Sequence, residues 1–163
     1  MGMSSRFNFE GFINERGGEL NHGYTQVFRN GALEATKAQI ARQHDGEVVI
    51  GGLGLEQQFF EVFPNYVDGL RNLGVAPPLV VMLTLEGVEG AVYAVRENVF
   101  NEQRPLLDRS LVLLPECVIN EYGPAVTYHQ AIRPAFDTLW NAIGYSRSQF
   151  FDDTGLWVGN ARR

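Results

Sequence analysis

The stretch Gly23–Ala35, GYTQVFRNGALEA, carries the clearest local fold signal in the chain. A run of alternating polarity leads into Asn30-Gly31, and Asn-Gly is a strong hairpin signal because both central positions of a type I′ turn need a positive φ. A two-residue turn at this point would place Phe28 opposite Leu33, which gives the hairpin one apolar face. The stretch therefore predicts a β-hairpin, and the arginine beside the turn is most simply an exposed residue.

The return leg of this hairpin is ambiguous in the sequence. Residues 32–43, ALEATKAQIARQ, are rich in good helix formers, with Leu33, Lys37 and Ile40 at helical spacing. The apolar face beside the turn favours a strand as far as Lys37, and the choice between strand and helix stays open for the segment as a whole.

Two amphipathic helices are expected. Apolar residues recur at spacings of three and four in both segments: Phe59, Phe63, Tyr66, Leu70 and Leu73 in the first, and Ile132, Phe136, Leu139, Trp140 and Ile143 in the second. Gly74 and Gly144 are placed to end them. Pro64 lies inside the first segment, so we expect either a kink there or a helix that begins near the proline.

The remaining apolar runs predict strands, in a fold of class α+β. They cover residues 7–13, 24–29, 47–50, 79–85, 91–95 and 110–119, the last one bent or split at its proline, and 79–85 is expected to pair with 91–95 as a second hairpin. We predict a mostly antiparallel sheet of about six strands with two helices packed on one face. The predicted organisation is an N-terminal arm (1–22), one α+β domain (23–145) and an aromatic C-terminal tail (146–163).

Size and charge narrow the class of protein. The chain has 163 residues, 45% of them hydrophobic, and a net charge of −6, which fits an acidic globular protein and gives no support to non-specific binding of duplex DNA. No window is long and apolar enough for a membrane span or a signal peptide, so a cytoplasmic location is the default expectation. A single cysteine rules out an intramolecular disulfide.

The glycines at residues 51–54 are the first candidate for chemistry. Gly51, Gly52 and Gly54 lie between a predicted strand and a predicted helix, where a phosphate-binding loop would lie. The spacing fits neither a dinucleotide fingerprint nor a P-loop, which needs Gly-Lys-Ser/Thr. These glycines are therefore weak candidates for a nucleotide site and are better explained as a connector.

Catalysis and metal binding have little support in the sequence. Cys117 and His129 are suitable residue types for nucleophilic catalysis, but Cys117 lies in an apolar run without a nearby activating feature. The histidines are isolated and show no metal-ligand spacing. We predict no catalytic residues, no metal and no cofactor; whether the chain is an enzyme stays open, with the balance against it.

The C-terminal tail has a surplus of aromatic residues. Phe150, Phe151 and Trp157 follow the last periodic helix. They either fold back onto the domain or contact a partner protein, since aromatic residues anchor interfaces.

Three ordered segments resemble the region C-terminal to the AlbA domain in bacterial Schlafen-type AlbA proteins, which are usually described as DNA-binding or ATP-binding. They are GYTQVFRNG (Gly23–Gly31), LGVAPP (Leu73–Pro78) and RPAFDTLWN (Arg133–Asn141), and the resemblance extends over roughly residues 23–150. The AlbA domain itself is absent from this chain. The resemblance thus implies a companion region, and any nucleic-acid role of the family would belong to the part that is missing.

These observations favour a non-enzymatic module for protein interaction or oligomerisation, with a protein partner or a second copy as the binding partner. The first alternative is a nucleic-acid-binding protein in which Arg29 contacts phosphate, although the net charge does not support it. The second alternative is a sensor or enzyme that binds a small ligand or nucleotide at the Gly51–Gly54 loop.

Overall fold

The computed structural model describes residues 3–16, 23–96 and 104–159. The chain divides into two compact units: unit 1 is Met1–Ile40 with Asn65–Val75, and unit 2 is Ala41–Pro64 with Ala76–Arg163. Both contain strands, and the long helix α1 contributes residues to each. Two helices with mostly antiparallel strands confirm the α+β class, although the strands form several small sheets rather than one sheet of about six strands.

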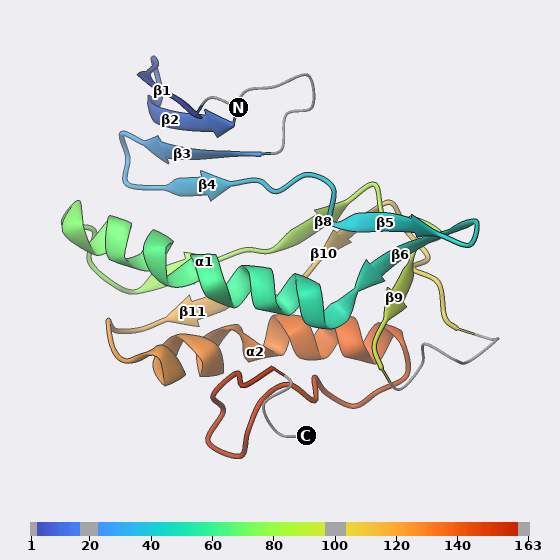
Figure 1. The fold of residues 1–163 in the computed structure, drawn as a ribbon. Coiled ribbons are helices and arrows are strands. Elements are labelled where there is room, and N and C mark those ends of the chain that lie inside the picture. The colour runs from blue at the N-terminus through green and yellow to red at the C-terminus, as the bar shows by residue number, and fades with distance from the viewer. Residues whose placement is uncertain (1–2, 17–22, 97–103, 160–163) are drawn as a thin grey trace. The chain divides into compact units, whose positions relative to one another are not determined.

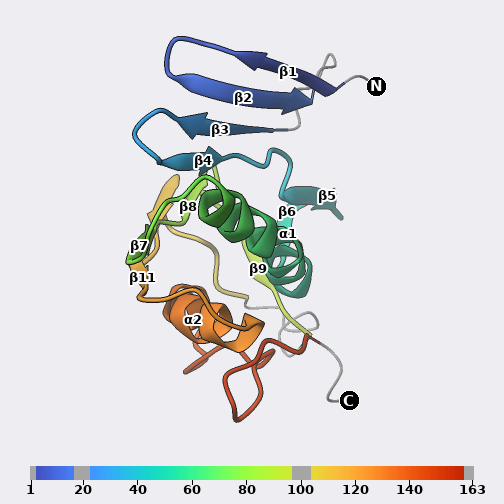
Figure 2. The same ribbon diagram turned by 90° about the vertical axis from the view of Figure 1, so that its left-hand side faces the viewer.

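Unit 1 is built on a four-stranded antiparallel sheet in the order β1-β2-β3-β4 (Figure 1, Figure 2). Its strands are β1 (Met3–Phe7), β2 (Gly11–Arg16), β3 (Tyr24–Phe28) and β4 (Leu33–Ala35). The single strand predicted at residues 7–13 is instead a hairpin, because the chain turns between Phe7 and Gly11. The return leg after Asn30-Gly31 is a strand, as favoured, but it ends at Ala35 rather than at Lys37.

The turn between β3 and β4 is longer than predicted. Phe28 N–H donates to Ala32 C=O at 2.8 Å, and Gly31 N–H donates to Phe28 C=O at 3.0 Å, with Gly31 at φ 88°. This pattern closes a three-residue loop with glycine in the left-handed region. Val27 therefore lies opposite Leu33, and the predicted Phe28–Leu33 pairing is wrong by one residue.

A two-residue turn occurs in unit 2 at Asp45-Gly46, whereas the sequence predicted such a turn at Asn30-Gly31. Asp45 and Gly46 have φ values of 49° and 82° between paired strands β5 (Ala41–His44) and β6 (Glu47–Gly51). Positive φ at both positions is the requirement of a type I′ turn. The strand predicted at residues 47–50 is confirmed as β6, whereas β5 had no prediction as a separate strand.

Long-range pairing of the strands of unit 2 differs from the predicted hairpin. β6 pairs in parallel with β9 (Val92–Ala94), so the apolar run at 91–95 does not pair with 79–85. The remaining strands form two antiparallel ribbons, β7 (Leu79–Val81) with β11 (Cys117–Ile119) and β8 (Thr84–Glu86) with β10 (Leu111–Leu113). The run at 110–119 is split into two strands, as one of the sequence alternatives foresaw.

The two helices are α1 (Gly52–Asn72) and α2 (Ala125–Ala142). α1 begins directly after β6 and runs through Pro64, so the helix does not begin at the proline. Gly74, at φ 80°, donates its N–H to Arg71 C=O, which ends the helix as predicted. No helix formed by the described residues is both long and apolar enough to cross a bilayer.

Within unit 2 the first part of α1 packs against α2, with α2 also lying against β11 (Figure 1). The predicted stripe of α2 is confirmed, since Ile132, Phe136, Leu139, Trp140 and Ile143 are all buried. The predicted stripe of α1 is confirmed in part: Phe63 is buried, Phe59, Tyr66 and Leu70 are half-buried, and Leu73 is 63% exposed. The side chains that α1 buries fully are those of Glu56, Phe60, Phe63 and Val67. Phe60, which the predicted stripe omitted, contacts rings from α2 and from the tail.

Candidate functional site

A buried carboxyl group is the most unusual feature of unit 2. Glu56 lies in the second turn of α1 and has 0% of its surface exposed. Its Oε1 accepts from Trp140 Nε1 at 2.8 Å, and its Oε2 accepts from Trp157 Nε1 at 2.9 Å. Ser148 Oγ lies within 3.1 Å of both oxygens. One glutamate thus joins α1, α2 and the C-terminal tail.

Burial dominates the acid–base behaviour of this carboxyl group. Desolvation raises the pKa of Glu56 from 4.5 to about 7, although hydrogen bonds from Trp140, Trp157 and Ser148 act in the opposite direction. The Asp137 charge raises it a little further. Burial, together with the nearby Glu56 carboxyl, also raises the pKa of the Tyr93 hydroxyl.

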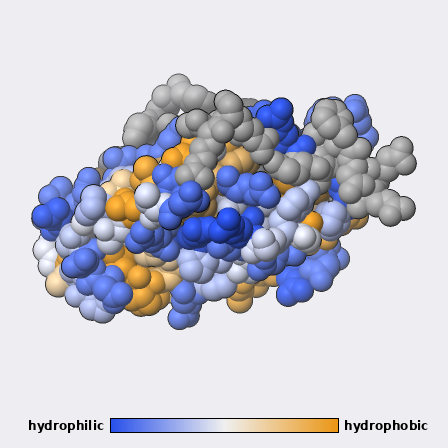
Figure 3. Space-filling view, turned by 90° about the horizontal axis from the view of Figure 1, so that it is seen from below, coloured by the Kyte–Doolittle hydropathy of each residue, from blue (hydrophilic) through white to orange (hydrophobic). Residues whose placement is uncertain are grey.

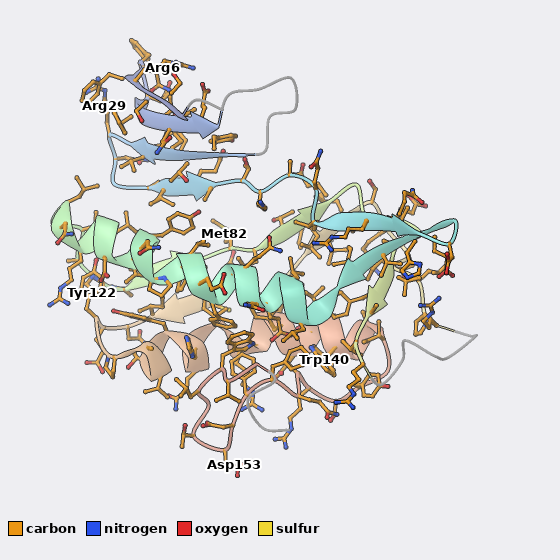
Figure 4. The ribbon with its side chains drawn as sticks, viewed as in Figure 1. Arg6, Arg29, Met82, Tyr122, Trp140 and Asp153 are labelled. Atoms are coloured by element: carbon orange, nitrogen blue, oxygen red, sulfur yellow. The ribbon has the colours of Figure 1, made fainter. Side chains whose placement is uncertain are left out.

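The tail segment 150–159 is held over α2 by a second set of contacts. The backbone N–H of Trp157 donates to His129 Nδ1 at 2.9 Å, and the Trp157 indole stacks on Phe60 with ring centroids 5.3 Å apart. Burial lowers the pKa of His129, which favours the neutral ring that accepts this hydrogen bond. Figure 4 shows Trp140 on α2 in this crowded region.

The beginning of the tail is fixed by charged residues of α2. Ser148 N–H donates to Asp137 Oδ1 at 2.8 Å, while Arg133 Nε lies 3.4 Å from Asp137 Oδ2. The Arg133 guanidinium also lies over the Phe151 ring, 5.3 Å from its centroid. Asp137 therefore orients both the tail backbone and the cation that covers Phe151.

The geometry around Glu56 suits structural ordering better than reaction with a substrate. Both carboxyl oxygens accept hydrogen bonds from the protein, and the side chain has no exposed surface. A polar cavity of about 370 Å³ lies beside the tail, lined in part by Arg133, Arg147, Asp152 and Asp153. Its side chains carry both signs of charge, so it has no clear preference for an anion or a cation. In Figure 3, the view from below, hydrophilic residues separate the hydrophobic areas that are not hidden by grey atoms.

The aromatic residues of the tail fold back onto unit 2. Phe150 and Phe151 are buried, and Trp157 is partly buried. Phe150 packs edge-on against Trp140, with ring centroids 5.3 Å apart, and Phe151 packs against Phe60. The structure therefore shows the first of the two alternatives raised by the sequence, and a partner contact of these rings stays a prediction.

The glycine candidates lie at a strand–helix junction. Gly51 is the last residue of β6, and Gly52 and Gly54 belong to the first turn of α1. A Cβ at Gly52 would meet Val95 at 2.9 Å and Tyr93 at 3.0 Å, so close packing accounts for this glycine. Nothing lies within 4 Å of a Cβ built at Gly51 or Gly54. A nucleotide site at this junction stays a prediction.

The other sequence candidates are dispersed. Cys117 is buried in β11, and burial raises the pKa of its thiol, which disfavours the reactive thiolate. Arg29 is exposed, and its Nε donates to Phe9 C=O at 3.1 Å. Arg6 and Arg29 are both labelled on unit 1 in Figure 4. Over residues 3–16, 23–96 and 104–159, no three His, Cys, Asp or Glu side chains are grouped as metal ligands.

The two ribbons of unit 2, with the connection between β7 and β8, present an exposed apolar surface, which we call the outer face. It consists of Val80, Met82, Leu111, Leu113 and Val118, with exposed fractions between 46% and 70%. Val80 and Val118 lie directly opposite each other across β7 and β11. Leu111 and Leu113 occupy alternate positions of β10, while Val112 between them is paired with the buried Leu85.

Sequence reasoning missed Glu56 and Ser148. A signal for Glu56 was present, because it lies four residues before Phe60 on the stripe that continues to Phe63 and Val67. A charged residue in register with an apolar stripe is buried with partners. Ser148 has no comparable signal, since its position depends on the path of the tail.

Comparisons of the chain with protein families, curated proteins and solved structures return no match.

Proposed function

We propose that this chain is a non-enzymatic module for protein interaction or oligomerisation, with the outer face as a surface for contact with another protein. The observation that carries the proposal is the outer face itself. Four of its five apolar side chains stand on β7, β10 and β11, Met82 lies between β7 and β8, and all five are between 46% and 70% exposed. Exposed apolar patches on soluble proteins are characteristic of interaction sites.

The composition of this surface supports contact with protein. Val, Leu and Met side chains offer dispersion and burial but few hydrogen bonds, so they suit an apolar partner surface. The resemblance to the companion region of Schlafen-type AlbA proteins stays a prediction. It proposes an AlbA-type domain as the first partner to test.

The test uses the full chain and the triple variant Val80→Thr, Met82→Thr, Leu113→Thr. Threonine retains a branched, strand-compatible side chain but reduces the apolar area. Leu106→Thr is a matched control, because Leu106 is 55% exposed but lies outside the outer face. Binding of a purified AlbA-type domain is measured by calorimetry, and self-association is measured by sedimentation equilibrium.

The wild-type chain and the control are expected to bind either the AlbA-type domain or a second copy of the chain. The triple variant is expected to bind at least about tenfold more weakly, which corresponds to about 1.4 kcal/mol. Association with neither partner would contradict the proposal, and so would equal association by the triple variant.

Nucleic-acid binding is the second candidate, and one observation favours it. Phe9 is 93% exposed beside Arg29, which combines a ring for base stacking with a cation. Unit 1 has five basic and five acidic residues, so it lacks an excess of positive charge. Fluorescence titration with a single-stranded oligonucleotide at two salt concentrations tests it. Binding that weakens with salt and is lost in Phe9→Ala and Arg29→Gln would support this candidate, and no binding at low salt would reject it.

A further inference from the structure

The outer edge of the unit 1 sheet is formed by β1. Among the residues that the structure describes, β1 pairs with β2 alone, in an unbroken register from Met3↔Arg16 to Phe7↔Phe12. Figure 1 and Figure 2 show β1 as the last strand of this sheet. Natural edge strands are usually protected by proline, bulges or short length. β1 has five residues, no proline and no bulge.

The hydrogen bonds of the sheet identify which backbone groups face outward. Asn8 N–H donates to Gly11 C=O at 2.9 Å, so the Asn8–Gly11 pair is hydrogen-bonded. Antiparallel pairs alternate between bonded and non-bonded. The pairs made by Arg6 and Ser4 are therefore bonded to β2, and those made by Phe7, Ser5 and Met3 are not. The N–H and C=O groups of residues 3, 5 and 7 point away from β2.

These outward groups suit a second copy of the same strand. An antiparallel pair centred on Ser5 places residue 3 opposite residue 7 of the other copy and Ser5 opposite its own equivalent. All three outward residues of each strand are then hydrogen-bonded. A register centred on Arg6 would use only two of them and would bring the two Arg6 side chains into opposition, which is unfavourable.

The side chains of β1 agree with this register. In it Arg6 lies opposite Ser4 of the other copy, and Arg6 remains paired with Glu15 of its own chain at 3.1 Å. Phe7 is 80% exposed and stands at the free edge beside Phe12, with their ring centroids 5.2 Å apart. A neighbouring strand would cover part of the Phe7 ring, which gives the contact an apolar contribution in addition to its backbone bonds.

We propose that β1 pairs antiparallel with β1 of a second copy about a two-fold axis at Ser5, so that two unit 1 sheets join into one sheet of eight strands. The contact is isologous, as closed dimers require. It uses β1 of unit 1, whereas the outer face belongs to unit 2, so separate variants test the two contacts.

The first test is Ser5→Pro in the full chain, measured by sedimentation equilibrium. Proline removes the outward N–H of residue 5 but none of the bonds from β1 to β2, so the unit 1 sheet is retained. The expected result is a wild-type dimer whose dissociation constant rises at least about tenfold in Ser5→Pro, because one hydrogen bond per copy is lost across the axis. Ser5→Thr keeps the N–H and is expected to dimerise like the wild type.

The second test fixes the register by oxidative cross-linking. Across the proposed axis the two Ser5 Cα atoms lie roughly 5.5 Å apart, within disulfide range, whereas the two Ser4 Cα atoms lie roughly 8 Å apart, beyond it. Ser5→Cys is expected to form a covalent dimer on mild oxidation, and Ser4→Cys is expected not to. The native Cys117 is buried and is unchanged in both variants.

The inference is overturned if the wild-type chain is monomeric at every concentration, or if Ser5→Pro dimerises as strongly as the wild type. Loss of the dimer in the outer-face triple variant, with retention in Ser5→Pro, would place the second copy on the outer face. That result would support the proposed function and reject the pairing of β1. The opposite result would support the pairing of β1, and binding of the AlbA-type domain would then decide the role of the outer face separately.

Discussion

Two clusters of aromatic residues, one near each end of the described chain, differ in burial. Phe150, Phe151 and Trp157 of the tail are packed into unit 2, whereas Phe7 and Phe9 of the N-terminal hairpin are exposed. The sequence around both groups contains turn residues and charges. Aromatic content alone therefore does not decide whether a terminal segment docks on its own domain.

The two clusters differ in burial because different side chains are available to pack against them. The tail meets the rings of Phe60 and Trp140, and its polar N–H groups find acceptors in Glu56 and His129. A buried indole needs such an acceptor, because an unpaired N–H costs stability. The hairpin rings contact one another, as Phe7 and Phe12 do, but no helix covers Phe7 in the described structure.

The largest expected effect is the removal of a tail ring from the core. Phe151→Ala should lower the free energy of unfolding of unit 2 by about 3–5 kcal/mol, because a buried phenyl ring is replaced by a cavity. Denaturant unfolding followed by tryptophan fluorescence measures it, and both tryptophans, Trp140 and Trp157, belong to unit 2. A loss below about 1 kcal/mol would mean that the tail is not part of the cooperative core.

The second largest expected effect is a pH dependence of the unfolding free energy that comes from the Glu56 carboxyl group. Its pKa is raised in the fold from 4.5 to about 7, so the folded state binds the proton more tightly than the unfolded state. The stabilisation is complete below about pH 4.5 and is lost as the pH rises through about 7, by about 3 kcal/mol in all. Unfolding free energies measured across this range should fall towards alkaline pH.

Glu56→Gln provides the control for this pH dependence. Glutamine cannot ionise, and it keeps one oxygen acceptor at a site where two indole N–H groups donate. The difference in stability between the two proteins should therefore grow in favour of the variant as the pH rises. Burial lowers the pKa of His129, so its contribution to stability is lost at acid pH. Both proteins contain His129, and its effect therefore cancels when their unfolding free energies are subtracted. Parallel profiles for the two proteins would show that Glu56 is not responsible.

Local patterns predicted several elements of the fold correctly. Asn30-Gly31 marks a real turn, Gly74 and Gly144 end helices, and the stripe of α2 is buried as its spacing predicts. The register beside Asn30-Gly31 was missed because Arg29 joins the loop. That choice depends on tertiary contacts, including the bond from Arg29 N–H to Glu10 C=O at 2.9 Å.

Contacts between distant segments could not be predicted from local patterns. The parallel pairing of Val49 with Val92 joins residues separated by α1 and two further strands. The hydrogen bond from Trp157 to Glu56 joins residues 101 positions apart. A periodic pattern identifies which face of a helix is apolar but not which distant segment will cover it. The path of the tail over α1 and α2 could therefore not be predicted from the sequence.

A smaller loss of stability is expected when His129, which accepts a hydrogen bond from the tail, is replaced. His129→Leu fills the space beside Phe60 with an apolar side chain and removes the Nδ1 atom that accepts from Trp157 N–H. The expected loss of stability is about 1–2 kcal/mol, since the amide loses its partner. Hydrogen exchange at the Trp157 amide should become faster, and His129→Asn, which offers an oxygen acceptor, should restore part of the protection. Unchanged exchange in His129→Leu would show that this bond does not hold the tail.

The smallest effect should come from the exposed cluster. Phe9 is 93% exposed, so Phe9→Ala is expected to change the free energy of unfolding by less than about 0.5 kcal/mol. Unit 1 has no tryptophan, so its unfolding is followed by circular dichroism or hydrogen exchange. The Phe9 ring contributes no burial that its loss could remove, although Phe9 C=O is held by Arg29. That backbone bond survives the substitution. A loss near that of Phe151→Ala would mean that the ring is covered in solution, and a second copy on unit 1 would then be the first cover to test.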